Sequence, residues 1–129
     1  MVELPPYARL LRLSAAEIDG RLTFTMPFHD DVTGRPGFLH GGAIAALLEF
    51  AAFGTLRREL DRDGAAASAA MKPVTVTTDF LRGGRPKDTM ATARIERLGR
   101  RIANVDAVAW QDARDVPIAN ARMTFLLER

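Results

Sequence analysis

The chain has 129 residues, which is enough for one domain with a substantial hydrophobic core and too few for two. Hydrophobic residues make up 47% and charged residues 26%, the balance of a soluble globular protein, and the formal net charge is only +2. There is no cysteine, which excludes disulfides, thiolate metal sites and cysteine nucleophiles and fits a reducing cytoplasm.

Three further classes are disfavoured by the distribution of charge. The first residues, MVELPPYARL, have no basic segment followed by an apolar one, so we expect no secretory signal. Residues 38–56 barely reach membrane-spanning length and contain Glu49, so we interpret them as a buried helix. The arginines are scattered and no basic run is present, which argues against nucleic-acid binding and leaves a small polyanionic ligand as an option. The sequence therefore predicts a cytoplasmic protein.

In the first half of the chain, residues 7–13 have the pattern of a short amphipathic helical turn. Two strands are predicted at 15–18 and 21–28, joined at the tight Asp19-Gly20 turn. The polar, turn-rich residues 29–37 predict a loop. Apolar side chains at helical spacing then predict one long helix of about 18 residues that begins at Gly41-Gly42. These side chains are Ile44, Leu47, Leu48, Ala51, Ala52 and Leu56.

The second half has the rhythm of strands only. Residues 64–70, GAAASAA, are expected to form a flexible or half-helical exit from the helix. Further strands are predicted at 73–81, 89–99, 101–112 and 117–128, with short turns between them. Short connections imply antiparallel neighbours, so we expect an α+β fold in which an antiparallel sheet wraps around one long central helix.

The helix is apolar on nearly every side, and the sheet can cover only one flank of it. In a chain this short, a second copy is expected to cover the rest. A homodimer is therefore predicted before any function is considered.

Glu49 is the one charged residue between His40 and Arg57. A carboxylate in apolar surroundings costs several kcal/mol unless it is paired, hydrogen-bonded or protonated. Its neighbours on the helix cannot pair with it; they are Ala45, Ala46, Ala52 and Phe53. Two interpretations remain open: either Glu49 lies on a strip of the helix that touches water, or it faces a functional pocket.

Glycines stand at the start of the same helix, in the sequence His40-Gly41-Gly42. The first turn of a helix presents unpaired N–H groups, and glycine allows a ligand to approach them closely. One such donor can stabilise the oxyanion of an acyl-transfer transition state by about 3 kcal/mol. Gly41 and Glu49 are about 12 Å apart along the helix axis, so they would cooperate across a dimer interface.

These residues resemble the hotdog-fold thioesterases of the PaaI-like group, which is related to the 4-hydroxybenzoyl-CoA thioesterases. The segment GFLHGG (37–42) is similar to the G-x-x-H-G-G segment of that group, and Glu49 follows His40 at the group's spacing of nine residues. DFLRGGRPKDTMATARIERLGRR (79–101) and ANARMTFLL (119–127) resemble later strands of the family. The resemblance thus covers nearly the whole chain as a single domain, residues 1–129.

The resemblance implies acyl-CoA thioester hydrolysis without a cofactor. The Gly41 N–H would polarise the thioester carbonyl, and Glu49 of the other subunit would act as nucleophile or as general base. His40 would shape the turn, in which Gly42 also stands. Phe38, Phe50 and Phe53 would line an apolar slot for the acyl chain. The resemblance also implies that this chain forms a homodimer and that the dimers assemble into a homotetramer.

Two positions depart from the family pattern. Many relatives have Asn or Gln where this chain has Gly34. A Ser or Thr that some relatives place after the helix falls near Pro73, with Thr75 and Thr77 as substitutes.

The resemblance implies that basic side chains in or beside the predicted turns bind the nucleotide end of coenzyme A. They are Arg82, Arg85, Lys87, Arg100 and Arg101. His29, Asp30 and Asp31 are a poor ligand set without a fourth group, so no metal is expected. Two alternatives to the thioesterase remain: a hotdog hydratase or dehydratase that needs His29 or His40 as base, and a non-catalytic acyl-CoA binder.

Overall fold

The computed structural model describes residues 4–64 and 69–128. A short helix α1 (Tyr7–Leu10) precedes the hairpin of β1 (Ser14–Ile18) and β2 (Arg21–Met26), and a 3₁₀ turn η1 (Asp30–Val32) precedes the long helix α2 (Gly41–Arg62). Four strands follow: β3 (Ala70–Phe80), β4 (Thr89–Leu98), β5 (Ile102–Trp110) and β6 (Pro117–Glu128).

The elements predicted from the sequence are present, and most of their boundaries differ from the predicted ones by one to four residues. Helix α2 has 22 residues rather than about 18, because the charged residues after Leu56 continue it to Arg62. Strand β3 begins at Ala70, before the predicted start at Pro73. Residues 65–68 of the predicted exit segment lie outside the described residues. No helix in the described part of the chain is long and apolar enough to cross a membrane.

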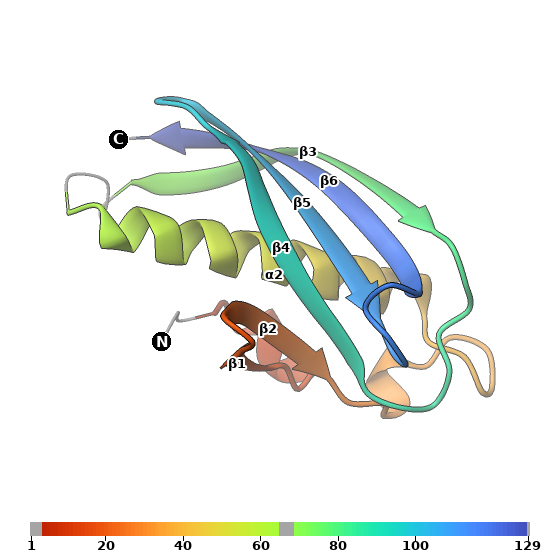
Figure 1. The fold of residues 1–129 in the computed structure, drawn as a ribbon. Coiled ribbons are helices and arrows are strands. Elements are labelled where there is room, and N and C mark those ends of the chain that lie inside the picture. The colour runs from red at the N-terminus through yellow and green to blue at the C-terminus, as the bar shows by residue number, and fades with distance from the viewer. Residues whose placement is uncertain (1–3, 65–68, 129) are drawn as a thin grey trace.

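All six strands form one antiparallel sheet in the order β1-β2-β4-β5-β6-β3. Strand β3 follows the helix in the chain but pairs with the last strand, β6, and so forms one edge of the sheet. Figure 1 shows the sheet arching over α2, with β1 and β2 on one side of the helix and β3 and β6 on the other. The predicted α+β fold, a sheet wrapped around one long helix, is confirmed.

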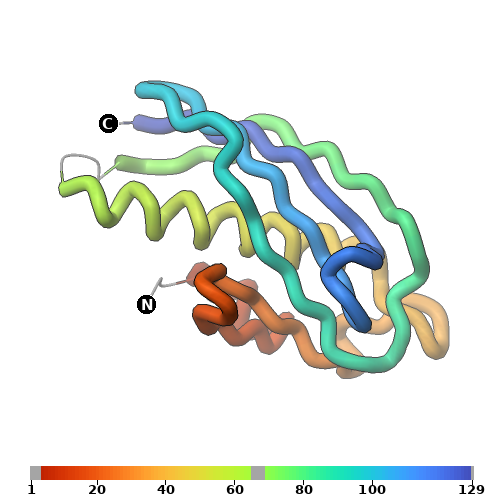
Figure 2. The backbone as a smooth tube through the Cα atoms, viewed as in Figure 1, coloured from red at the N-terminus to blue at the C-terminus, as the bar shows by residue number. Residues whose placement is uncertain are grey.

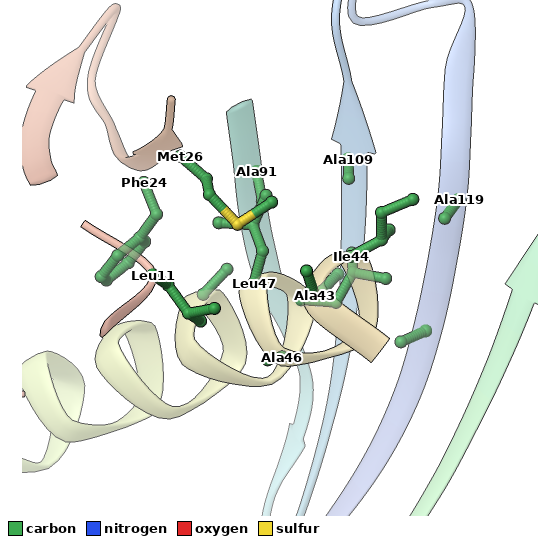
Figure 3. Packing of buried hydrophobic residues seen from close by; sticks show 14 of the residues in the cluster. Leu11, Phe24, Met26, Ala43, Ile44, Ala46, Leu47, Ala91, Ala109 and Ala119 are labelled. Atoms are coloured by element: carbon green, nitrogen blue, oxygen red, sulfur yellow. The ribbon is translucent and has the colours of Figure 1, made fainter. Parts of the chain in front are cut away.

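The core lies between α2 and the concave face of the sheet. Leu47, Leu48 and Leu56 of the helix are completely buried. Figure 3 shows Leu47 facing Met26 of β2, with Phe24 beside them. A Cβ at Gly54 would lie 2.4 Å from Cζ of Phe24, so the absence of a side chain lets the helix pack closely on β2.

Strand β3 is left uncovered on the face that points toward the helix. Val76 is paired with Met123 and Phe80 with Ala119, and both partners on β6 are buried. Val76 and Phe80 themselves are 38% and 55% exposed. A sheet edge with exposed apolar side chains is a surface for pairing with another chain.

Candidate active site

His40 and Gly42 together build the start of α2. His40 has an extended backbone (φ −69°, ψ 133°) and is the N-cap residue, and its Nδ1 accepts a hydrogen bond of 2.9 Å from the Gly42 N–H. A Cβ at Gly42 would lie 2.9 Å from the His40 ring, so this cap requires glycine there. The imidazole therefore satisfies one of the unpaired donors at the helix start, as a Ser or Asp cap would.

The Gly41 N–H is the donor that the cap leaves open. The Gly42 N–H is taken by the His40 ring, and the Ala43 N–H donates to the His40 carbonyl at 3.0 Å. Within the described residues the Gly41 N–H has no acceptor. It lies at the positive end of the helix dipole with the Phe80 ring beside it, 3.5 Å from where a Cβ of Gly41 would be. This is the geometry of a site for a carbonyl or anionic oxygen.

The loop between β3 and β4 packs against this turn. The Leu39 N–H donates to the Gly84 carbonyl at 2.9 Å, and a Cβ at Gly83 would lie 3.0 Å from Cε1 of Phe38. The guanidinium group of Arg85 lies 4.4 Å from the centroid of the Phe38 ring. The predicted residues Phe38 and Arg85 are thus brought beside His40 and Gly41.

Arg35 belongs to the same cluster, although the sequence analysis did not single it out. Its guanidinium group lies 3.9 Å from the Phe38 centroid, and since two groups this close cannot share one face, the ring lies between Arg35 and Arg85. The available signal was an arginine three residues before an aromatic residue in a turn-rich loop. Arg82 lies in the neighbouring loop, where its guanidinium donates to the Pro117 carbonyl.

Glu49 lies at an apolar pocket formed by one face of α2, the N-terminal segment and the sheet. The volume of the pocket is about 210 Å³. It is lined by Pro5, Tyr7, Ala46, Glu49, Phe50, Phe53, Pro73, Met123 and Phe125.

The Glu49 carboxylate has no ionic or hydrogen-bonding partner among the described residues. Burial raises the pKa of its carboxyl group above the ordinary value of 4.5, because desolvation disfavours the charged form. Of the two interpretations left open by the sequence, the structure favours the pocket over a strip of ordinary surface.

Thr77 is not brought to this pocket. It pairs with Arg122 and, with Asp79, lines a polar hollow of about 550 Å³ on the outer face of the sheet. Pro73 lines the Glu49 pocket instead, so the position near which the resemblance places the Ser or Thr of some relatives holds a residue without a hydroxyl. Thr75 pairs with Thr124, two positions from Arg122 on the same outer face of β6, and so also faces away from Glu49.

The basic residues fall into two groups at opposite ends of the sheet. Figure 2 shows the β3–β4 connection, with Arg82 and Arg85, at the end where α2 begins. Arg100 and Arg101 stand in the β4–β5 turn at the other end, where they line a separate hollow with the end of β6. Lys87 is paired with Asp112. Within one chain, only Arg82 and Arg85 of the predicted set accompany Gly41.

Gly34 packs against the backbone of His40. A Cβ at Gly34 would lie 3.1 Å from Cα of His40, which is tighter than ordinary contacts allow. The loop therefore has no room for the amide side chain that relatives carry at this position without a shift of the backbone.

His29 is buried and is hydrogen-bonded to the backbone of another segment. It is 9% exposed, and its Nε2 is 3.1 Å from the Leu11 carbonyl, to which it donates in the matching tautomer. This bond ties the loop before α2 to the segment after α1. The described residues contain no group of three or more His, Asp or Glu side chains placed to hold a metal ion.

A long helix wrapped by an antiparallel sheet, with a histidine-capped glycine turn and a carboxylate two turns later, defines a hotdog-fold domain of the thioesterase type. A family model described as the acyl-CoA thioesterase N-terminal domain matches residues 29–126. The chain therefore belongs to this acyl-CoA thioesterase family, and the resemblance to hotdog-fold thioesterases is confirmed.

Solved structures agree with this assignment. A protein of Chromobacterium violaceum is 38% identical over 94% of this chain and 82% of its own, with a TM-score of 0.72. The BH2602 protein of Bacillus halodurans, crystallised with CoA, has a TM-score of 0.85 at 20% identity and covers 98% of this chain and 80% of its own.

A third similar structure comes from Ralstonia eutropha JMP134, a thioesterase candidate described as phenylacetic acid degradation-related. It is 23% identical over 97% of this chain and 92% of its own, with a TM-score of 0.76. Among curated proteins, none is significantly similar in sequence.

Proposed function

We propose that the protein hydrolyses an acyl-CoA thioester to the free acid and CoA. The observation that carries this proposal is the half-buried Glu49 carboxylate, which has no partner among the described residues and lies in an apolar pocket. Membership of an acyl-CoA thioesterase family supports it. The absence of cysteine is consistent with the reducing cytoplasm, where we propose that it works.

The chemistry follows from the two unsatisfied groups. The thioester oxygen accepts a hydrogen bond from the Gly41 N–H, which becomes stronger as negative charge develops on that oxygen. Glu49 then either attacks the carbonyl carbon or removes a proton from an attacking water. In the first route, an anhydride forms, CoA leaves as the thiolate, and water cleaves the anhydride. Desolvation raises the pKa of Glu49 and makes its ionised form a better base in either route.

Gly41 and Glu49 of one chain are separated by about 12 Å of helix rise, too far to act on one carbonyl group. We therefore assign the two groups of each site to different subunits of a homodimer. Strand β3 supplies the interface, because it is an edge strand with Val76 and Phe80 exposed, and the Phe80 ring lies beside Gly41. The exposed ion pairs Arg94–Glu96 and Arg122–Asp106 on the outer face of the sheet would serve the predicted pairing of dimers into a tetramer.

The phosphates of CoA would be bound next to the oxyanion turn. Arg82, Arg85 and Arg35 place guanidinium groups in or beside the loops that contact Phe38 and Leu39. Guanidinium groups bind phosphates through paired hydrogen bonds, so this cluster suits the polyanionic end of the substrate. The similar BH2602 protein has been crystallised with CoA, which supports a CoA thioester as substrate.

The test is release of free thiol from a panel of short, medium, long and aryl acyl-CoA thioesters. Glu49→Gln removes the ionisable group while it keeps the size of the side chain, and we expect at least a hundredfold loss of kcat with retained binding. Glu59→Gln is the matched control, since Glu59 is on the same helix, is 45% exposed and is paired with Arg62. Equal loss in both variants, or no effect of Glu49→Gln, would contradict the proposal.

A non-catalytic acyl-CoA binder is the second candidate, because Gly34 and Pro73 lack the side chains that relatives place at the site. Tight binding of acyl-CoA without thiol release by the natural protein would select it. The hydratase alternative receives less support at His40, whose Nδ1 already accepts from the Gly42 N–H. His29 is buried and donates from Nε2 to the Leu11 carbonyl, while its Nδ1 has no partner among the described residues.

A further inference from the structure

One wall of the pocket beside Glu49 comes from the N-terminal segment and not from α2 or the sheet. Phe50 and Phe53 come from α2 and Phe125 from β6, while Pro5 and Tyr7 come from the N-terminal segment. The Tyr7 ring is stacked on Phe50 with a centroid distance of 6.4 Å and an interplanar angle of 28°. The N-terminal segment therefore closes one side of the pocket with a ring.

This segment is firmly held at the residues that follow Tyr7. Ala8 and Leu11 are 5% and 1% exposed, and the Leu11 carbonyl is the partner of the His29 Nε2 at 3.1 Å. Tyr7 itself is 52% exposed. An anchored segment that presents a half-exposed aromatic ring at the mouth of an apolar pocket is the arrangement of a binding wall rather than of a core residue.

We infer that Tyr7 is a specificity-determining residue that limits the site to compact acyl groups, with an aryl ring or a short chain, and excludes long fatty acyl chains. This inference rests on the proposed function, because it identifies the acyl pocket by its proximity to Glu49. A pocket of about 210 Å³ is smaller than the roughly 300–1,000 Å³ typical of sites for drug-sized ligands. Tyr7 is stacked on Phe50 and both rings line the pocket, so a long chain that filled the pocket would meet the Tyr7 ring.

Aromatic rings on several sides also favour an aryl group over a linear chain of equal area. Ring pairs gain affinity beyond that of their buried area in offset or edge-to-face contacts. The rings of Tyr7, Phe50 and Phe53 supply such contacts from the N-terminal segment and from the helix.

The test measures binding, so that it does not depend on hydrolysis. Uncleavable S-ethyl-, S-benzyl- and S-decyl-CoA thioethers are titrated into the natural protein, Tyr7→Ala, Tyr7→Phe and Leu10→Ala. Leu10→Ala is the matched control, because Leu10 lies on the same short helix, is 48% exposed and does not line the pocket. Circular dichroism and melting curves establish that each variant is folded.

The natural protein is expected to bind S-benzyl-CoA at least tenfold more tightly than S-decyl-CoA. In Tyr7→Ala, the affinity for S-decyl-CoA should rise about tenfold while that for S-benzyl-CoA falls. Tyr7→Phe and Leu10→Ala should keep the natural preference. Equal binding of the benzyl and decyl thioethers by the natural protein would overturn the inference, as would an unchanged preference in folded Tyr7→Ala.

Thiol release from benzoyl- and decanoyl-CoA then separates this inference from the proposed function. Benzyl-selective binding without thiol release supports the role of Tyr7 and overturns hydrolysis. Release from both thioesters at equal kcat/KM supports hydrolysis and overturns the role of Tyr7.

Discussion

At the scale of single residues, the environment of Glu49 distinguishes this helix from an ordinary core helix. The sequence identified Glu49 by composition alone, as one carboxylate among alanines, leucines and phenylalanines. The sequence could not predict which side of α2 is exposed to solvent, because this depends on where the sheet and the N-terminal segment pack. The structure places Glu49 between apolar walls and raises its pKa by desolvation.

This environment predicts the pH dependence of hydrolysis. Only the ionised carboxylate can act as nucleophile or base, so kcat/KM should rise with pH through the raised pKa of Glu49 rather than near the ordinary value of 4.5. The pH profile of kcat/KM with a saturable aryl thioester measures the midpoint of this rise. A midpoint at or below the ordinary value would contradict the buried environment.

The same titration should appear in the stability of the fold. Burial favours the protonated acid, so the folded chain binds this proton more tightly than the unfolded chain does. The resulting stabilisation is present below pH 4.5 and is lost as the pH rises through the raised pKa. Glu49→Gln should therefore gain stability over the natural protein as the pH rises, in urea unfolding between about pH 4 and pH 8. A difference that does not change with pH would show that Glu49 titrates as it does in the unfolded chain.

At the scale of elements, the start of α2 depends on an unusual cap. His40 occupies the position at which Ser, Thr, Asp or Asn is preferred, and its ring accepts from the Gly42 N–H. The cap keeps the Gly42 donor occupied and leaves the Gly41 donor for a ligand. The role of His40 predicted from the sequence, shaping the turn, fits this geometry.

Substitution of His40 can separate capping from chemistry. His40→Ala should lose about 1 kcal/mol of folding stability together with activity, because the helix start loses its cap. His40→Asn retains a capping acceptor and should recover most of both. Chemical denaturation and kcat are measured on the same preparations. A stable His40→Asn protein that is inactive would show that the imidazole takes part in the reaction.

The order of the elements could be predicted from hydrophobic periodicity. Which side chains of β3 point to which face of the sheet could not. Simple alternation from Pro73 puts Thr75 and Thr77 on the same face as Pro73. The strand has an irregularity between Pro73 and Thr75, where Val74 is an extra residue, and this shifts the alternation by one. The threonines therefore face outward and Val76 faces the helix side. Pro73 is the one signal of such a bulge, because proline in a sheet is confined to edges and bulges, but it does not show which residue is the extra one.

At the scale of the whole molecule, one chain carries both parts of the proposed catalytic site but cannot bring them together. The sequence already indicated this through the helix spacing of Gly41 and Glu49 and through a helix too apolar for one sheet to cover. The structure adds the edge strand β3, on which Val76 and Phe80 are exposed and the Phe80 ring lies beside the helix start. Pro73 was a signal that β3 is an edge strand, but its pairing with the last strand could not be predicted from the residues.

Two variants can each disable one half of the composite site. Gly41→Pro removes the open N–H at the first helical position, where proline is tolerated, and the extended His40 backbone (ψ 133°) is compatible with a following proline. Gly41→Ala keeps the N–H and is its control. Glu49→Gln removes the carboxylate. Each variant alone is expected to lose at least a hundredfold in kcat.

The most direct test of the shared site is complementation between these two variants. They are co-expressed with different tags, and the mixed dimer is isolated and assayed for thiol release. In the mixed dimer, one site combines the intact Gly41 of one chain with the intact Glu49 of the other, so about half of the natural activity should return. A mixed dimer as inactive as its parents would contradict a site built from two subunits.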